Sequence, residues 1–305
     1  MDNFSPFSLL EASQWRDYEL IDSGNGLKLE RFGPYTFVRP EVQAMWKPAL
    51  PDNEWSSAHA VFQPTSEESG GHWVVRKKIP ERWEMTYPLP SRSSPGELRF
   101  WAMTSHGRHL GVFPEVAPHW DFMVDAIQRS DGGPAKVLNL FGYTGLASLA
   151  AAAAGAGVTH VDASKRSVTW ARENQALSKL DGRPIRWIVD DAQKFVKREG
   201  RRGVRYDGII LDPPKFGRGP KGEVWEVYKS LPALLEDCCA ILSDKPLFMI
   251  ATVYAVKASA IHVGQALTEI MKKHQGRVES GELVTRESSS RRLLSQAVYA
   301  RWQAA

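Results

Sequence analysis

The stretch "ILDPPKFGRG" contains residues that could hold and align a planar nucleophile. Asp212 follows the apolar run "YDGIIL" and is expected at the carboxyl end of a buried strand. Pro213 and Pro214 have no backbone N–H donor, so the turn that they stiffen presents carbonyl acceptors. Such a corner can accept the protons of a nucleophile and aim it at an electrophile, so Asp212, Pro213 and Pro214 are candidate catalytic residues. A simple turn that ends a strand would have the same residues.

A glycine turn in "LNLFGYTG" offers a second kind of chemistry, the binding of a nucleoside. Gly142 and Gly145 permit close approach of the backbone, and a helix that starts near Thr144 has free N–H groups. A strand, a glycine turn, a helix and an acid about 20 residues later describe a nucleoside-binding βαβ unit. The third glycine of the dinucleotide fingerprint is missing, and Phe141 and Tyr143 crowd the place of a pyrophosphate. The turn therefore favours a ligand with a smaller polar end.

Two further acids end apolar runs, Asp162 in "VTHVDA" and Asp191 in "IRWIVDD". Asp162 can accept hydrogen bonds from two ribose hydroxyls, and Asp191 with the N–H of Ala192 can contact an adenine amino group. Each acid could instead cap the helix that follows it, and Ser164 could cap equally well. The coincidence of three such signals at successive strand ends indicates one ligand site at the carboxyl edge of a sheet.

The elements that must position these residues recur regularly after Gly133. Apolar runs are centred near Leu138, His160, Trp187 and Ile210, at the period of strand–helix–strand crossovers in a parallel sheet. A helix over 223–242, a fifth strand "PLFMIATVY" and a helix over 257–274 are expected next. The chain then closes with two alternating runs, "GRVESGELVTR" and "LSQAVYARW", which predict a strand pair whose last member can be antiparallel.

Residues 1–90 are expected to form a small β-rich domain, and residues 91–305 the domain that carries the site. Turn-forming stretches such as "SGNG" and "PDNE" interrupt short β-prone runs in the first part. The stretch "PLPSRSSPG" (88–96) is the expected linker, followed by two strands and a helix over 96–127. Seven of the 11 tryptophans lie in the first 120 residues. They could form a stacking platform for unpaired bases or the core of the small domain.

Composition places the chain among ordinary globular proteins. It has 305 residues, 43% of them hydrophobic and 24% charged, and a formal net charge of +4 that leans towards an anionic partner. Cys238 and Cys239 are adjacent, so no disulfide framework is possible and a reducing compartment is expected. The start of the chain has no signal-peptide pattern, and the run 146–158 is too short to cross a bilayer. We therefore expect a cytoplasmic protein that does not bind a membrane.

A metal site is not expected, because His106, His109 and His119 have no partner cysteines and no metal-like spacing. The oligomeric state is left open.

In the order "LNLFGYTG", "VDAS", "VDDA", "LDPPKF" and a terminal strand pair, the sequence resembles the class I S-adenosylmethionine-dependent methyltransferases. Within that class it is similar to the branch of large-subunit ribosomal RNA methyltransferases. The resemblance covers about residues 98–305. It implies an α/β, Rossmann-like, mostly parallel seven-stranded sheet with a small β-rich N-terminal domain. It also implies S-adenosyl-L-methionine as cofactor.

The resemblance carries over to particular residues. In the family the stretch before the sheet touches the cofactor, which maps by position to "LGVFPEVAPHW" and makes Phe113, Pro114, Glu115 and His119 candidates. It implies that Phe141, Gly142 and Tyr143 line the methionine end, that Asp162 with Ala163 binds the ribose, and that Asp191 with Ala192 reads the adenine.

The expected methyl acceptor is a ring or exocyclic nitrogen of RNA, with ribosomal RNA as the expected substrate. RNA methyltransferases that attack carbon 5 of a pyrimidine use a cysteine near the end of the fourth or fifth strand, where this sequence has "DPPKF" and "ATVYA". The corner departs from the usual amino-methyltransferase pattern, because Lys215 intervenes and the aromatic Phe216 comes one residue later.

The basic stretches fall into two sets, according to the edge of the sheet at which each is expected. The stretch "KREGRRGVR" precedes the fourth strand and is expected at the far edge, as a solvated loop. The stretches after the fourth strand and between the last two strands fall on the cleft side and can meet phosphates. The substrate-binding candidates are Lys215, Phe216, Arg218, Lys221, Arg286, Arg291 and Arg292. Ordinary exposed charge is the alternative for the basic ones.

Other functions compete with RNA methylation. The acceptor could be a protein or a small molecule, or the chain could be a catalytically silent RNA-binding protein. The intact Asp162, Asp191 and "DPP" argue against the silent protein. The missing third glycine and the terminal strand pair argue against a nicotinamide dehydrogenase.

Overall fold

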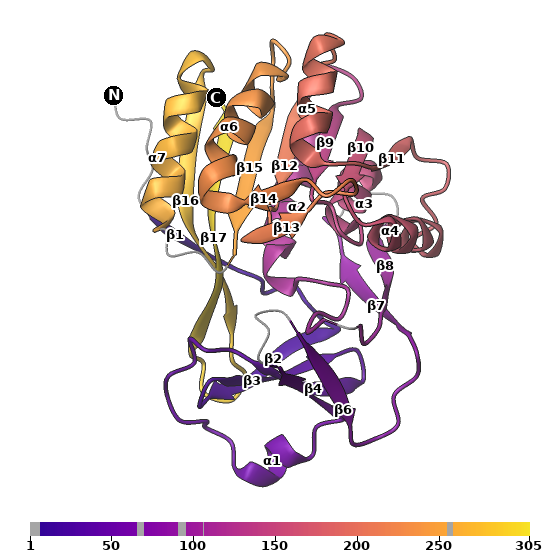
Figure 1. Cartoon of the computed structure of the whole chain (residues 1–305), viewed down its shortest axis with the longest axis vertical. Helices are drawn as coiled ribbons and strands as arrows, with labels where there is room; N and C mark the ends of the chain where they lie inside the picture. Colours follow the sequence, from indigo (N-terminus) through magenta and orange to yellow (C-terminus); the bar gives the residue numbers. More distant parts are fainter. Residues whose placement is uncertain (1–6, 66–69, 91–95, 106, 255–258) are drawn as a thin grey trace.

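The computed structural model describes residues 7–65, 70–90, 96–105, 107–254 and 259–305. Within these residues the largest unit is an eight-stranded sheet in the order β1-β16-β17-β15-β12-β9-β10-β11 (Figure 1). Its strands are β1 (Ser8–Glu11), β9 (Lys136–Leu140), β10 (Gly157–Asp162), β11 (Ile185–Val189), β12 (Gly208–Leu211), β15 (Phe248–Val253), β16 (Gly276–Arg286) and β17 (Leu293–Ala304). Only β17 runs antiparallel to its neighbours in this sheet, as the two alternating runs at the end of the sequence predict.

The mostly parallel α/β sheet is confirmed, and it contains one strand more than the seven expected. The additional strand, β1, pairs in parallel with β16 at the edge of the sheet, with Ser8 level with Gly281. It comes from the first residues of the chain, within the range assigned to the small β-rich domain. An open sheet edge leaves backbone donors and acceptors unpaired, and β1 supplies partners for those of β16.

Helices cover both faces of the sheet because its central strands are buried on both sides, as parallel strands are. One face packs on α2 (Ala117–Gln128), α3 (Leu146–Ala153) and α4 (Lys165–Leu177). The other packs on α5 (Ala192–Arg201), α6 (Val227–Ala240) and α7 (Ala260–Ile270), which stand in front of the strands in Figure 1. Each face of the strands therefore has its own apolar core.

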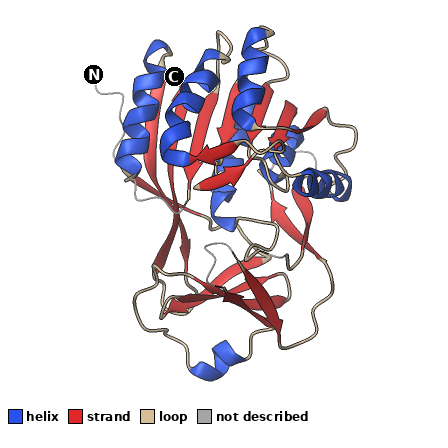
Figure 2. Ribbon diagram, in the orientation of Figure 1, coloured by secondary structure: helices blue, strands red, loops and turns tan. Residues whose placement is uncertain are grey.

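The N-terminal part is rich in strands, as expected (Figure 2). It contains a five-stranded sheet in the order β2-β3-β4-β5-β6 and one short helix, α1 (Asp52–Ser56). The strands are β2 (Tyr18–Gly24), β3 (Leu27–Phe32), β4 (Tyr35–Pro40), β5 (Ala60–Pro64) and β6 (Gly71–Val75). Its tryptophans pack inside: Trp83 is 6% exposed, and the Trp46 and Trp73 indoles donate to the backbone carbonyls of Ser23 and Ser105. These contacts favour the core role over an open stacking platform.

The expected linker 88–96 joins the two strands of a hairpin, β7 (Trp83–Pro88) and β8 (Glu97–Ala102), and its residues 91–95 lie outside the described residues. Of the two strands expected over 96–127, only β8 forms within the described residues. The chain turns at Gly111, whose φ is +97°, and a Cβ there would lie 2.3 Å from the Trp170 ring. This turn leads into the 3-10 helix η1 (Pro114–Val116) and α2.

Two helix limits differ from the sequence prediction. The helix expected from residue 223 begins at Val227, because the preceding residues form a hairpin of β13 (Phe216–Arg218) and β14 (Val224–Glu226). The helix expected over 257–274 is α7, which is followed by the 3-10 turn η2 (Met271–Lys273). Residues 257 and 258 lie outside the described residues.

The hairpin of β16 and β17 reaches from the large sheet to the N-terminal sheet (Figure 1). Glu287 at its tip forms a bridge with Leu20, and the Ser288 N–H donates to the Leu20 carbonyl at 2.9 Å. The Glu287 carboxylate is fully buried and accepts from the Arg292 Nε at 2.8 Å. Because β16 runs parallel to β15 and its tip lies beyond their common end, the hairpin holds the N-terminal sheet at the carboxyl edge of the large sheet.

None of the helices in the described ranges is long and apolar enough to span a membrane. Within those same ranges, His, Cys, Asp and Glu side chains form no group of three that could hold a metal ion.

Candidate active site

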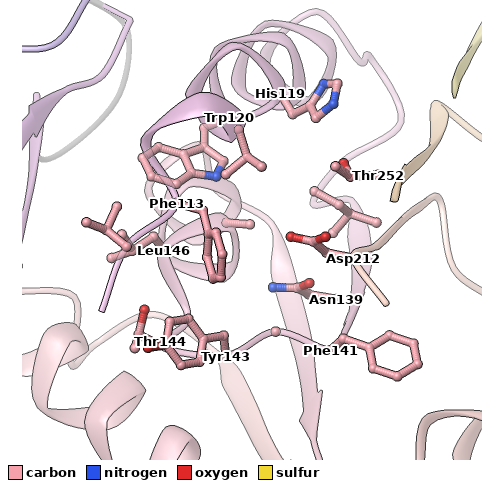
Figure 3. A pocket seen from close by; sticks show the side chains of 15 residues that line it. Phe113, His119, Trp120, Asn139, Phe141, Tyr143, Thr144, Leu146, Asp212 and Thr252 are labelled. Carbon is pink, nitrogen blue, oxygen red and sulfur yellow. The ribbon is translucent and has the colours of Figure 1, made fainter. Parts of the chain in front are cut away.

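A pocket opens at the carboxyl ends of β9, β12 and β15, beneath the first turns of α2 (Figure 3). Its walls are Val112, Phe113, Val116, His119 and Trp120 from the segment before α2 and its start, Asn139, Phe141, Gly142, Tyr143, Thr144, Leu146 and Ala147 around the glycine turn, and Ile210, Asp212 and Thr252 from β12 and β15. The structure therefore brings the glycine turn, the "DPP" corner and the stretch before the sheet to one place.

The glycine turn curls tightly because two of its bulky residues adopt left-handed backbone angles. Phe141 has φ +56° and Tyr143 has φ +49°, angles that L-residues rarely adopt outside constrained sites. Gly142 is required for packing, since a Cβ there would lie 2.3 Å from the His160 ring. The Thr144 hydroxyl donates to the Gly111 carbonyl at 2.6 Å, which ties the turn to the segment before α2.

Asp162, at the end of β10, orders this turn through its carboxylate. Oδ2 accepts from the Tyr143 N–H and Oδ1 from the Ser164 N–H, each at 2.8 Å. The cap of α4 is Ser164, whose hydroxyl accepts from the Ser167 N–H. Burial raises the pKa of Asp162, and the two backbone hydrogen bonds oppose that rise. Each carboxylate oxygen has two lone pairs, so both can accept a further donor such as a ribose hydroxyl.

Asp191 caps a helix, which is the alternative role that the sequence allowed for it. It precedes α5, and its Oδ1 accepts from the Lys194 N–H at 2.9 Å. Ala192 is the first residue of that helix and is buried. Asp162, Ala163, Asp191 and Ala192 are not among the pocket-lining residues; they lie at or after the ends of β10 and β11, the strands beyond the glycine turn. An adenine contact by Asp191 therefore stays a prediction.

The carboxyl group of Asp212 lines the pocket and, among the described residues, lacks a hydrogen bond that buried polar groups normally have. Its Oδ1 is buried and has no hydrogen-bond partner in the described part of the chain. Figure 3 shows the carboxyl pointing across the pocket towards the Phe113 ring. Burial raises the pKa of Asp212 well above its ordinary value, and the nearby Glu115 raises it further. A buried acceptor without a partner costs free energy in the absence of a ligand, so it indicates that a donor binds here.

Trp225 fixes the "DPP" corner and was not identified from the sequence. Its indole N–H donates to the Pro214 carbonyl at 2.7 Å, and its ring lies 5.0 Å from that of Phe141. The Pro214 carbonyl, one of the acceptors that the turn was expected to present, is therefore already hydrogen-bonded. The only signal in the sequence was an aromatic residue in the β-prone "EVWEV", which our prediction placed in a helix.

Buried polar side chains next to Gly142 form a hydrogen-bonded chain. The sequence did not identify this chain either. The Asn139 amide donates to the Ser148 hydroxyl at 2.9 Å, which lies 3.0 Å from the His160 Nδ1. Burial lowers the pKa of His160 to about 3. His119 on α2 is fully buried as well, its pKa is lowered to about 3, and neither ring nitrogen has a partner within the described residues. A polar Asn inside the run "KVLNLF" was the available signal.

The proposed substrate-binding residues divide into two groups. Lys215, Phe216, Arg218 and Lys221 follow the "DPP" corner and are exposed, Phe216 by 54%. Arg286 instead binds Glu11, with Nε 2.9 Å from Oε1, and Arg292 binds the buried Glu287. Arg291 is exposed at the hairpin tip. The first group thus follows the pocket residue Asp212 along the chain, whereas Arg286 and Arg292 form ion pairs with Glu11 and Glu287.

Comparisons with known proteins agree on one class. The family described as "Conserved hypothetical protein 95" matches residues 122–280. The crystal structure of an S-adenosylmethionine-dependent methyltransferase from Agrobacterium tumefaciens is 46% identical, with a TM-score of 0.92, and the match covers 99% of this chain and 95% of that one.

Curated relatives match over a shorter range. The ribosomal RNA large subunit methyltransferase K/L of Hahella chejuensis is 38% identical over 149 residues, which is 48% of this chain and 19% of the relative. The protein of the same name from Shewanella sp. (strain ANA-3) is 40% identical over 98 residues, 32% of this chain and 14% of the relative. The chain therefore spans less than a fifth of the length of these two relatives.

Proposed function

The chain belongs to the conserved hypothetical protein 95 family and to the S-adenosylmethionine-dependent methyltransferases, and from this premise we propose that it methylates a nitrogen of ribosomal RNA. When bound, S-adenosyl-L-methionine supplies a methyl group activated by a sulfonium. The chain has to hold the acceptor nitrogen in line with that methyl group, exclude water and remove a proton. Positioning of this kind can lower a barrier by roughly 7–11 kcal/mol.

The pocket residues, together with the acids at the adjoining strand ends, fit this cofactor. The glycine turn and the Asp162 carboxylate would hold the adenosine and methionine portions, with Asp191 and Ala192 at the adenine. The rings of Phe113 and Tyr143 lie 5.6 Å apart at the pocket wall. Aromatic faces attract cations, so these rings suit a sulfonium.

One observation carries the choice of a nitrogen acceptor, namely the buried Asp212 Oδ1 that has no partner among the described residues. An amino or ring N–H of a nucleobase would donate to this oxygen and would thereby be aligned with the cofactor. Carbon methylation through a thiolate is not supported, because Cys238 and Cys239 lie on α6 and the described pocket wall contains neither. Burial also raises the pKa of the Cys238 thiol.

The surface around the corner supports a nucleic acid as substrate. The exposed Phe216 ring can stack on a base, and the neighbouring Lys215, Arg218 and Lys221 can meet phosphates. The two curated relatives are named for methylation of large-subunit ribosomal RNA. We infer that residues 1–90 act as a substrate-binding part, because their sheet lies at the same edge as the pocket. We also infer a cytoplasmic location, where ribosomal RNA is found.

Mass spectrometry of nucleosides tests the proposal. Ribosomal RNA from cells with and without this protein would be digested, and one N-methylated nucleoside should be missing without it. Restoration by the wild-type chain, but not by Asp212→Asn, would assign the loss to this site. Identical nucleoside profiles, with methylation instead of a protein or small molecule by the purified chain, would contradict the proposal.

A further inference from the structure

Two residues beside the pocket, Glu115 and Tyr254, have no role in the function proposed above. Tyr254 directly follows β15, which pairs in parallel with β12, with Ala251 level with Leu211. Asp212 therefore lies level with Thr252, and Tyr254 follows two residues later on the neighbouring strand. Glu115 lies on η1, the 3-10 helix in front of these strand ends. Three separate elements thus bring a carboxyl, a phenol and a second carboxyl to one edge.

The aromatic ring of Phe113 connects this cluster to the glycine turn. It lies 5.3 Å from the Tyr254 ring and 5.6 Å from the Tyr143 ring, measured between ring centres. Tyr254 is not itself part of the pocket wall, but its ring contacts Phe113, which is. A ligand that displaces the Phe113 ring would therefore bring Tyr254 within reach.

Two oxygen atoms of this cluster, one on Asp212 and one on Tyr254, are buried without a regular hydrogen bond within the described residues. Glu115 is only 6% exposed. The Tyr254 hydroxyl lies next to the Glu115 carboxyl, yet within the described residues it has no hydrogen bond of normal geometry, and neither has the Asp212 Oδ1. The Asp212 Oδ1 thus has no partner in the described part of the chain, and the Tyr254 hydroxyl has only the Glu115 carboxyl beside it. Such a cluster next to a pocket indicates a site built to receive a donor from a ligand.

Charges around the cluster favour a shared proton. Asp212 interacts electrostatically with Glu115, and Tyr254 with both acids. Lys28, Arg39 and Glu30 of the N-terminal sheet also interact electrostatically with Glu115. Burial raises the pKa of both acids, and the proximity of Glu115 raises that of Asp212 further, whereas Lys28 and Arg39 act in the opposite direction on Glu115. Two acids that interact in this way titrate as a pair, in which one proton and one negative charge can coexist.

We propose that Glu115 and Tyr254 complete the methyl-acceptor site around Asp212, and that this pair of acids accepts the proton released by an amino nitrogen of the base. The proposal rests on the function proposed above. The nitrogen–carbon bond forms as the sulfur–carbon bond of the cofactor breaks, which leaves a neutral thioether and a cationic nitrogen. The N–H proton then passes to the ionised member of the Glu115–Asp212 pair. Tyr254 donates to that carboxylate and holds it against the acceptor.

The main test compares Glu115→Gln and Tyr254→Phe with a matched control pair. The control is Asp121 and Tyr87, a carboxyl and a phenol joined by a 2.8 Å hydrogen bond. Neither pair lines the pocket wall, but Glu115 and Tyr254 interact electrostatically with the pocket residue Asp212, whereas Asp121 and Tyr87 interact with each other. Glu115→Gln should lower kcat on RNA by about 100-fold, in the range of general-base removal, and Tyr254→Phe by about 10-fold. The Kd of S-adenosylhomocysteine should change less than threefold in both. Asp121→Asn and Tyr87→Phe should leave kcat within about threefold of wild type.

The pH profile supplies a readout that a merely structural role would not move. Without the charge of Glu115, the pKa of Asp212 falls, so the acid limb of the kcat profile of Glu115→Gln should move to lower pH. A uniform loss of kcat with an unmoved acid limb would overturn the proposal. So would wild-type turnover in Glu115→Gln, or equal losses in the Asp121→Asn control.

A titration that needs no RNA separates failure of this inference from failure of the proposed function. Carbon-13 NMR of labelled aspartate, in protein saturated with S-adenosylhomocysteine, should show a lower Asp212 pKa in Glu115→Gln than in wild type. Wild-type protein without activity on RNA would refute the proposed function while this titration still tests the pair. An Asp212 pKa that is the same in both proteins would refute the pairing of the acids, whatever the substrate.

Discussion

Asp162→Asn should weaken cofactor binding with little effect on the fold. The carboxylate of Asp162 accepts one backbone N–H at each oxygen, from Tyr143 and from Ser164. Asparagine has almost the same shape, but only one of its two terminal atoms can accept. One backbone N–H of the glycine turn or of the helix start then faces an amide donor. A ribose hydroxyl that donates to Asp162 also loses its charged acceptor.

The magnitude follows from these lost contacts. A hydrogen bond to a charged group contributes about 1.5–3 kcal/mol, and about 1.4 kcal/mol corresponds to a tenfold change in Kd. One such bond lost from the complex predicts a Kd for S-adenosylmethionine that is raised by about 10- to 100-fold. Burial raises the pKa of Asp162, and ribose binding requires the ionised form. Wild-type affinity should therefore fall as the pH is lowered through that raised pKa, and the affinity of Asp162→Asn should not.

Isothermal titration calorimetry over a range of pH measures both effects. Asp207→Asn is the matched control, because its carboxylate also accepts a backbone N–H, from Lys136 at 2.8 Å, but at the opposite edge of the sheet. The control should bind the cofactor as wild type does. An unchanged Kd for Asp162→Asn, or an equal weakening in the control, would refute the assignment of Asp162 to the ribose.

Three further changes test other parts of the structure. Trp225→Phe removes the N–H that binds the Pro214 carbonyl and should lower kcat about tenfold at unchanged cofactor Kd; a wild-type kcat would show that the corner needs no such support. Arg292→Ala leaves the buried Glu287 carboxylate short of its cation and should lower the free energy of unfolding by about 3 kcal/mol, measured in urea, whereas a change below 1 kcal/mol would contradict a structural role. The pKa of Glu279 is lowered to about 2 in the fold, so its stabilising contribution is present above pH 4.5 and is lost as the pH falls towards 2. Glu279→Gln should cost about 2 kcal/mol at pH 7 once partial exposure is allowed for, and almost nothing at pH 2; an equal cost at both values would contradict the sign.

The sequence was sufficient to predict seven of the eight strands of the large sheet and the acids that end two of them. Buried parallel strands are continuous apolar runs, so β10 and β12 stand out, and the acid at the end of each run is easily found. Asp162 and Asp212 were identified in this way. Their placement needs only local pattern and the rule that ligands bind where parallel strands end.

Long-range pairing explains what sequence could not predict. β1 is four residues long and pairs with a strand near the other end of the chain, and no local pattern specifies such a partner. The roles of Arg286 and Arg292 in ion pairs likewise depend on where the terminal hairpin meets the N-terminal segments. Arginines in a loop have the same local sequence whether they meet phosphate or a buried carboxylate.

Competition between local conformational preferences explains the errors at the start of α6 and at Asn139. The residues before α6 were assigned to a helix, but the Gly219 N–H donates to the Glu223 carbonyl at 2.8 Å and Gly222 has φ +87°, which closes a hairpin. That hairpin is what brings Trp225 to the "DPP" corner. Similarly, Asn139 was read as part of an apolar strand, although its amide continues a buried hydrogen-bonded chain.

The position of a transferred label tests the central claim most directly. Purified chain would be incubated with ribosomal RNA and S-adenosylmethionine carrying a carbon-13 methyl group, and the labelled nucleoside would be fragmented in a tandem mass spectrometer. We predict the label on a nitrogen of one base, with the yield reduced at least 100-fold in Asp212→Asn while that variant still binds the cofactor. A label on a base carbon or a ribose oxygen, or an undiminished yield from Asp212→Asn, would contradict the account.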